Sequence, residues 1–138
     1  MNKMVSFDQI GALAATFPVD SATQETLKSK FLNTATGDVD INGKNLAVKL
    51  NEDGTVGFGA GTTTDGLFGV IVAYEMDGYA SVQIRGGVDN VPTSAAIKGG
   101  FKQLVAAADG KVAELEGGNK VAVVIPSTAD ELYASVIF

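Results

Sequence analysis

Residues 57–64, which read GFGAGTTT, form the stretch of this sequence that is most typical of a phosphate-binding loop. A P-loop needs two glycines five positions apart, then a lysine for the phosphates and a serine or threonine for Mg²⁺. Gly61 and Gly66 have that spacing, but Leu67 and Phe68 occupy the next two positions. The dinucleotide fingerprint also fails, because a threonine stands in place of its third glycine. An apolar run typical of a strand follows, so no helix N-terminus faces an anion, and we predict a structural or contact loop.

Residues 38–43 match the first half of an EF-hand calcium loop, D-x-[DN]-x-[DN]-G. Calcium in such a loop needs a bidentate carboxylate six residues after the glycine. That position holds Lys49, a cation. The pattern therefore predicts an Asx-rich turn and no metal site, with a weak cation site of another kind as the minor alternative.

Paired carboxylates are the remaining candidates for chemistry, because two of them can hydrolyse glycosides. The pairs are Asp130 with Glu131, Glu52 with Asp53, and Glu114 with Glu116. Acidic turn residues are expected at this composition, and the chain has no tryptophan to stack a sugar. It also has no cysteine and no histidine, which excludes the usual Cys-zinc sites and the Ser-His-Asp and Cys-His mechanisms. We therefore predict no catalytic residues, no metal ligands and no cofactor, and expect that the protein is not an enzyme.

Charge and composition narrow the possible partners. The 138 residues suit one domain, and the net charge is −6 with Arg85 as the single arginine. Without clusters of Lys and Arg, we expect binding neither to nucleic acid nor to an anionic membrane. The start of the chain does not read as a signal peptide, and the longest apolar run, GLFGVIVAY, is too short to cross a bilayer. We expect the protein to remain in the cytoplasm where it is made, or to be assembled there into something larger.

A mainly β fold is predicted from residue 39 onward. Asp-Gly pairs begin at Asp53, Asp65 and Asp77, and turn signals at such regular spacing are typical of a small antiparallel β-barrel or sandwich. We place the β-rich domain at residues 37–138. Its clearest hairpin joins residues 67–76 to residues 79–85 through a two-residue type I′ turn at Asp77 and Gly78.

The other strands follow from apolar alternation. Residues 67–74 are apolar on both faces, so that strand is expected to be central and covered on both sides. Residues 94–98 are expected to form a short helical turn. Further strands are predicted at residues 46–50, 121–125 and 133–138, with a hairpin of residues 103–107 and 112–115 turning at Asp109 and Gly110.

The first 36 residues lack this turn-and-strand pattern and are predicted to form short helices or an arm. A capping box at residues 6–9 begins a helix that Pro18 ends, and a second, weaker helix covers residues 21–32. Two interpretations remain open: a helix packed on the domain, or an arm that becomes ordered only on a partner. The apolar residues that could form a docking stripe on such an arm are Met4, Phe7, Ile10, Leu13 and Phe17.

Residues 44–138 resemble the head decoration, or capsid cement, proteins of tailed phages. The similar stretches are GLFGV, a charged turn, ASVQIRGGV, a VP segment, SAAIKGG and DGKV. The resemblance implies a small, β-tulip-like domain on the outside of the virion, often a homotrimer, that clamps subunits of the major capsid protein. It implies neither catalysis nor a cofactor. Because several such proteins bind the shell through an N-terminal arm, it also implies capsid contacts for the docking stripe, in a protein made in the host cytoplasm.

Two functions of other classes stay open. A carbohydrate-binding, adhesin-type β-domain would be favoured by a surface cluster of Tyr74 and Tyr79 with acidic residues. A small enzyme that uses Asp, Glu, Ser, Thr or Lys would be favoured by a deep pocket with convergent carboxylates.

Overall fold

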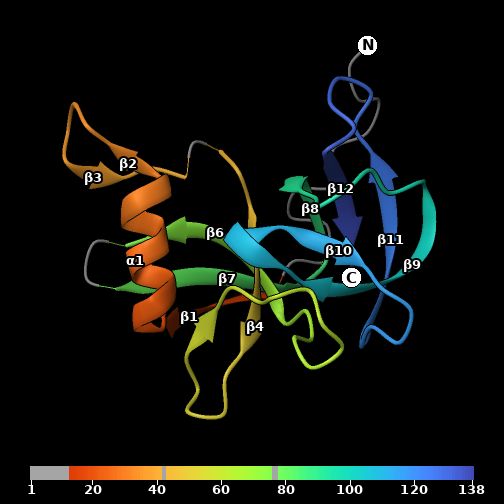
Figure 1. Ribbon diagram of the computed structural model, residues 1–138, viewed down its shortest axis with the longest axis horizontal. Coiled ribbons are helices and arrows are strands. Elements are labelled where there is room, and N and C mark those ends of the chain that lie inside the picture. The colour runs from red at the N-terminus through yellow and green to blue at the C-terminus, as the bar shows by residue number, and fades with distance from the viewer. Residues whose placement is uncertain (1–12, 42, 76–77) are drawn as a thin grey trace.

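The computed structural model describes residues 13–41, 43–75 and 78–138, and this part of the chain is mainly β (Figure 1). It contains two five-stranded antiparallel sheets, one α-helix and a two-stranded ribbon. The predicted fold class, a small antiparallel β-barrel or sandwich with a short N-terminal helical segment, is confirmed. Within these residues, no helix is both long and apolar enough to cross a membrane.

Each sheet is built mostly from strands that are neighbours in the sequence. The first sheet has the order β1 (Leu13–Pro18), β7 (Tyr79–Arg85), β6 (Gly69–Tyr74), β4 (Leu46–Leu50) and β5 (Val56–Gly57). The second sheet has the order β10 (Val112–Glu114), β9 (Gly100–Ala106), β11 (Lys120–Pro126), β12 (Tyr133–Ile137) and β8 (Gly87–Pro92). The remaining elements are α1 (Ser21–Lys30), the ribbon of β2 (Leu32–Asn33) and β3 (Asp38–Val39), and a 3₁₀ turn at Ala108–Gly110.

The first sheet is covered on both faces, so the molecule has two hydrophobic cores. Successive residues of β6 point to opposite sides of the sheet: Val70 belongs to the core between the two sheets, and Ile71 to the core beneath α1. We call the latter the second core, and Leu27 of α1 is fully buried in it. The prediction that residues 67–74 form a central strand covered on both sides is confirmed.

The expected first helix is a strand over its described part. Residues 13–18 form β1, an edge strand in which Leu13 pairs with Arg85 and Pro18 with Tyr79. Leu13 and Phe17 have the spacing of a helix, but the backbone hydrogen bonds available from β7 override that weak local preference. The capping box at residues 6–9 lies outside the described residues.

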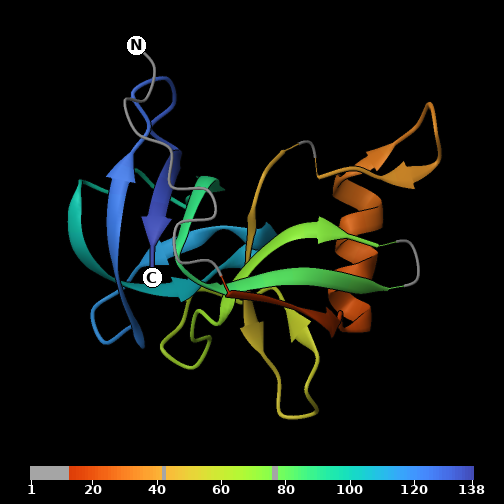
Figure 2. The same cartoon turned by 180° about the vertical axis from the view of Figure 1, so that it is seen from behind.

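The second predicted helix is confirmed as α1, with an end two residues earlier than expected. The side chain of Asp20 caps it by accepting a hydrogen bond from the Thr23 N–H at 2.8 Å. Leu27 packs in the second core with side chains of the first sheet. Figures 1 and 2 show α1 lying against that sheet. Of the two interpretations left open, residues 21–30 therefore fit the helix packed on the domain.

The central hairpin of β6 and β7 is confirmed, but its loop has three residues where two were predicted. The Glu75 N–H donates to the Tyr79 carbonyl at 2.7 Å, and the Gly78 N–H donates to the Glu75 carbonyl at 3.2 Å. Gly78 has a φ of +87°, which glycine adopts without strain. Met76 and Asp77 lie outside the described residues, so the type I′ turn predicted at Asp77 and Gly78 stays a prediction.

Gly78→Val is expected to lower the free energy of unfolding by roughly 1–3 kcal/mol, because a β-branched residue is strained at positive φ. Gly78→Asn is the matched variant, since asparagine tolerates this conformation and should lose less. Urea denaturation of both variants measures the difference. Equal stability of the two variants would show that the conformation of residue 78 does not limit the hairpin.

The remaining strand predictions are confirmed apart from small shifts at the ends: β4, β11, β12 and the β9–β10 hairpin all form. The helical turn expected at residues 94–98 is wrong, because this segment is irregular. The Ser94 N–H donates to the Val112 carbonyl at 3.0 Å, and Ile97 is buried between the sheets. These contacts fix the segment in a non-helical path toward β9.

Candidate functional site

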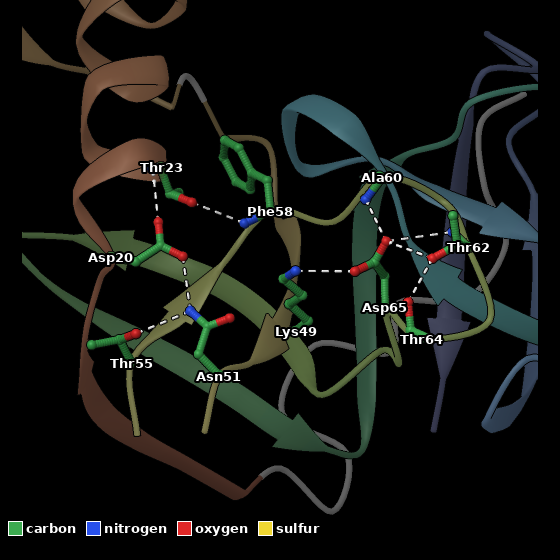
Figure 3. A network of polar contacts seen from close by, with 10 residues as sticks. All are labelled: Asp20, Thr23, Lys49, Asn51, Thr55, Phe58, Ala60, Thr62, Thr64 and Asp65. Carbon is green, nitrogen blue, oxygen red and sulfur yellow. Dashed lines mark hydrogen bonds and ion pairs between the residues drawn. The ribbon is translucent and has the colours of Figure 1, made fainter. Parts of the chain in front are cut away.

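The glycine-threonine segment forms a loop, residues 58–66, that folds around the carboxylate of Asp65. One oxygen of this carboxylate accepts hydrogen bonds from the Ala60 N–H at 2.8 Å and from the Thr62 hydroxyl at 3.0 Å. The other oxygen contacts the Lys49 ammonium at 3.0 Å. Asp65 is only 6% exposed, and Figure 3 shows these donors converging on it. The donors that an external phosphate would need therefore bind a carboxylate of the chain itself.

The environment of Asp65 stabilises its ionised form. The hydrogen bond from the Ala60 N–H, assisted by Lys49 and Thr62, lowers the pKa of Asp65 to about 2, although burial acts in the opposite direction. At neutral pH this carboxylate is ionised and its oxygens are occupied, so it is unsuited to general acid–base catalysis. The geometry favours the structural interpretation of GFGAGTTT.

Asp65 is expected to make stability pH-dependent. Its pKa in the folded protein lies below the ordinary value of 3.8, so its contribution is complete above about pH 5 and is lost as the pH falls towards 2. The loss should be about 1–2 kcal/mol after allowance for solvent screening. Urea unfolding from pH 7 to pH 2 measures it. Asp65→Asn should flatten the pH profile, and an unchanged profile would contradict this role.

The 58–66 loop also joins the two sheets. The Gly61 N–H donates to the Ala106 carbonyl at 3.0 Å, and the Ala106 N–H donates to the Asp65 carbonyl at 2.9 Å. Gly59 lies so close to β9 that an added Cβ would clash with the Ala106 carbonyl oxygen. Small residues are therefore required here by backbone packing, which answers why the loop is rich in glycine.

A second polar cluster ties α1 to the β4–β5 hairpin (Figure 3). Besides capping α1, Asp20 accepts a hydrogen bond from the Asn51 amide at 2.8 Å, and Asn51 also donates to the Thr55 hydroxyl at 3.0 Å. The Thr23 hydroxyl accepts from the Phe58 N–H at 2.9 Å. These side chains satisfy one another and anchor the helix.

The other acidic motifs take structural positions. Of the half EF-hand motif, Asn42 lies outside the described residues, and among the residues described no group of three acidic side chains could hold a metal ion. Asp53 and Asp130 accept hydrogen bonds from backbone N–H groups two residues ahead, as in Asx turns. Glu114 lies 3.7 Å from the Lys102 ammonium across the β9–β10 hairpin.

The predicted docking stripe is only partly within the described residues. Met4, Phe7 and Ile10 lie outside them. Leu13 is exposed on β1, whereas the Phe17 ring packs edge-on against Phe68, with ring centroids 5.2 Å apart, at the border of the second core. Of the two described members, only Leu13 therefore has an exposed side chain.

An exposed apolar surface that sequence reasoning missed lies on the second sheet. Val123 of β11 pairs with Phe101 of β9 on one side and with Ile137 of β12 on the other. Paired residues share a face of the sheet, and this face is opposite to the buried Ala122 and Val124. The exposed fraction of Phe101 is 80%. We define the outer face as Phe101, Val121, Val123, Ile125 and Ile137.

Strands β9, β11 and β12, which carry the outer face, lie side by side in Figures 1 and 2. Phe101 also borders a surface depression, whose other lining residues are Lys102, Gln103, Glu114, Leu115 and Glu116. Every second residue of β11 belongs to the outer face, and this alternation is the sequence signal that could have revealed the surface. Both sets of alternating residues are apolar, however, so the sequence does not indicate which one is exposed.

Comparison of the chain with protein-family models, curated proteins and solved structures finds no match.

Proposed function

We propose that this protein is a structural component of a virion that binds the outer surface of a tailed-phage head and bridges subunits of the major capsid protein. The observation that carries the proposal is the outer face, which is an apolar surface. The polar clusters described above, in contrast, hydrogen-bond within the domain itself. Exposed apolar patches of this kind mark protein–protein interfaces. The resemblance of residues 44–138 to head decoration proteins supplies the identity of the partner.

The polar sites support a binding role better than a catalytic one. Asp65 and Lys49 neutralise each other, and Asp20 caps α1. Asp53 and Asp130 accept backbone hydrogen bonds in turns. We therefore propose a non-catalytic protein without a cofactor.

The carbohydrate-binding alternative loses support from the positions of its two tyrosines. Tyr74 pairs with Ala80, and both pack against the second core. Tyr79 is adjacent to Ala80 in β7, so its side chain points to the opposite side of the sheet. The two rings therefore do not form one stacking platform for a sugar.

The test is binding to expanded capsids that lack their decoration protein. The full chain is expected to sediment with these particles. Phe101→Ser should weaken binding roughly tenfold or more if Phe101 is an interface anchor. Leu50→Ser is the matched control, because Leu50 is 48% exposed but lies on the first sheet. Failure of the full chain to bind any expanded head would contradict the proposal, and equal loss in both variants would remove the outer face from the interface.

We also propose that the protein associates with itself as a homotrimer, as the resemblance to head decoration proteins implies. A shell presents its sites in symmetric clusters, and contacts between neighbouring copies would add avidity to each capsid contact. A reconstruction of decorated particles should show three copies in contact at threefold or quasi-threefold positions. Isolated single copies in that reconstruction would contradict the trimer, whatever the state in dilute solution.

A further inference from the structure

Strand β9 is longer than the strand that pairs with it on one side. β10 pairs with residues 104–106 of β9, and beyond its end the Leu115 N–H donates to the Gln103 carbonyl at 3.0 Å. The chain then turns away, because the Gly118 N–H donates to the Leu115 carbonyl at 2.9 Å. β9 extends further, to Gly100, with β11 as its neighbour on the other side. Within the described residues, the start of β9 is therefore an unpaired edge of the second sheet.

The main chain of Phe101 points towards this edge. In an antiparallel sheet, the N–H and C=O of one residue point to the same side, and the sides alternate along the strand. The Gln103 carbonyl points to the β10 side, so both main-chain groups of Phe101, two residues earlier, also point there. No described residue forms a hydrogen bond with these two groups. Phe101 thus offers one donor and one acceptor to a further strand.

The depression beside Phe101 lies where β10 leaves β9. Residues 101–103 of β9 line one part of it, and residues 114–116 at the end of β10 line the other. A strand that continued the line of β10 would pass through this depression and pair with Phe101. Exposed strand edges bind extended peptides in this way, and main-chain hydrogen bonds then provide the affinity.

The side chains around the depression indicate which strand would fit. Two carboxylates and one ammonium line it, which gives a net charge of −1. The ammonium of Lys102 lies 3.7 Å from Glu114, so these two charges offset each other. Glu116 forms no ion pair with a described residue. A matching strand therefore has an apolar residue opposite the Phe101 ring and a lysine or arginine beside that residue.

We propose that residues 100–102 bind an extended segment of a partner protein, which adds a strand to the second sheet in line with β10. The segment runs antiparallel to β9, and one of its residues exchanges two main-chain hydrogen bonds with Phe101. The apolar side chain of that residue packs on the Phe101 ring, and the neighbouring basic side chain lies near Glu116. The inference goes beyond capsid bridging, because it concerns main-chain pairing at a strand edge and does not depend on what the outer face binds.

A synthetic peptide tests this pairing without a capsid. The probe is a short peptide of alternating valine and threonine in which a lysine replaces one threonine beside the central valine. At saturation it should slow hydrogen exchange of the Phe101 amide roughly tenfold or more in NMR spectra, because that N–H becomes hydrogen-bonded. The Leu115 amide is already hydrogen-bonded and should change little. Absence of saturable binding, or protection at another strand edge instead of at Phe101, would overturn the proposal.

Modified peptides separate main-chain pairing from side-chain attraction. N-methylation of the central valine removes the N–H that donates to the Phe101 carbonyl and should abolish binding. N-methylation of the lysine is the control, because its N–H points away from β9, and it should leave binding intact. Equal affinity of the two methylated peptides would overturn the proposal.

Charge variants of the protein test the second part of the recognition. Glu116→Lys should weaken peptide binding several-fold at low salt, because it reverses the charge beside the peptide lysine. Glu131→Lys is the matched control, since Glu131 is exposed in the loop between β11 and β12, and it should leave the affinity unchanged. Circular dichroism verifies that both variants fold. Equal losses of affinity in the two variants would contradict recognition of a basic residue at this edge.

Discussion

A chain that begins at Gly37 is expected not to fold cooperatively. Such a chain lacks α1 and β1, and with them the side chains of Val19 and Leu27 and the rings of Phe17 and Phe31 that pack in or against the second core. Full burial of an apolar side chain contributes roughly 1.5–3 kcal/mol. Val19 and Leu27 are buried and the two rings are partly buried, so their combined loss approaches the typical stability of a whole domain, about 5–15 kcal/mol. Far-UV circular dichroism and urea unfolding of this chain provide the measurement.

This expectation differs from the sequence-based boundary, which places the β-rich domain at residues 37–138 and would let that segment fold without the first 36 residues. Only a truncated chain can test that boundary. Leu27→Ala should by itself cost about 2–5 kcal/mol, because it opens a cavity in the second core. Leu13→Ala is the control, since Leu13 is exposed and should change stability by less than about 0.5 kcal/mol. A chain from Gly37 with native β circular dichroism and a sharp unfolding transition would restore the original boundary.

Gly59→Ala is expected to lower the free energy of unfolding by about 3 kcal/mol, near the upper end of the range for overpacking. The new methyl group would collide with the Ala106 carbonyl, which already accepts a hydrogen bond from the Gly61 N–H. Neither partner can move without separating the 58–66 loop from β9. Urea denaturation of the variant measures the loss.

Gly99→Ala is the matched control for that substitution. The nearest atom to a Cβ at Gly99 is the Cδ of Pro126 at 3.4 Å, an ordinary contact. We therefore expect Gly99→Ala to change the free energy of unfolding by less than about 1 kcal/mol. The main cause of that change is the conformational freedom that glycine gives the unfolded chain. If the two variants lose equal stability, the close approach of the loop to β9 does not contribute to the fold.

Much of the β architecture could be predicted because its signals are local. Alternating residues gave the exact bounds of β4 and β7, and the Asp77–Gly78 signal located the central hairpin although not the length of its loop. The strand β1 was missed because its pairing partner lies far along the chain: Leu13 pairs with Arg85, and nothing near Leu13 encodes that contact. The helical spacing of Leu13 and Phe17 was the stronger local signal.

The candidate site was less predictable for the same reason. Asp65 was interpreted as a turn residue, and its contact with Lys49 arises only when β4 and the 58–66 loop meet. The outer face was missed because Val121 and Ala122 are equally apolar in the sequence, and only the position of the first sheet decides which side is buried. Local patterns thus indicate strands, while the partners of each strand decide which residues become a surface.

The pairing of β1 with β7 sets an order of events during translation. Residues 13–18 leave the ribosome early, but the strand next to them in the sheet is complete only with Arg85. At 5–20 residues per second, the nascent chain waits roughly 4–14 s between these two points. During that time the apolar residues of β1 and α1 have no sheet to cover, and pairing between such distant segments is slow to form. The early part of the nascent chain is therefore the part most dependent on chaperones, and translation pauses before residue 85 should increase aggregation more than pauses after it.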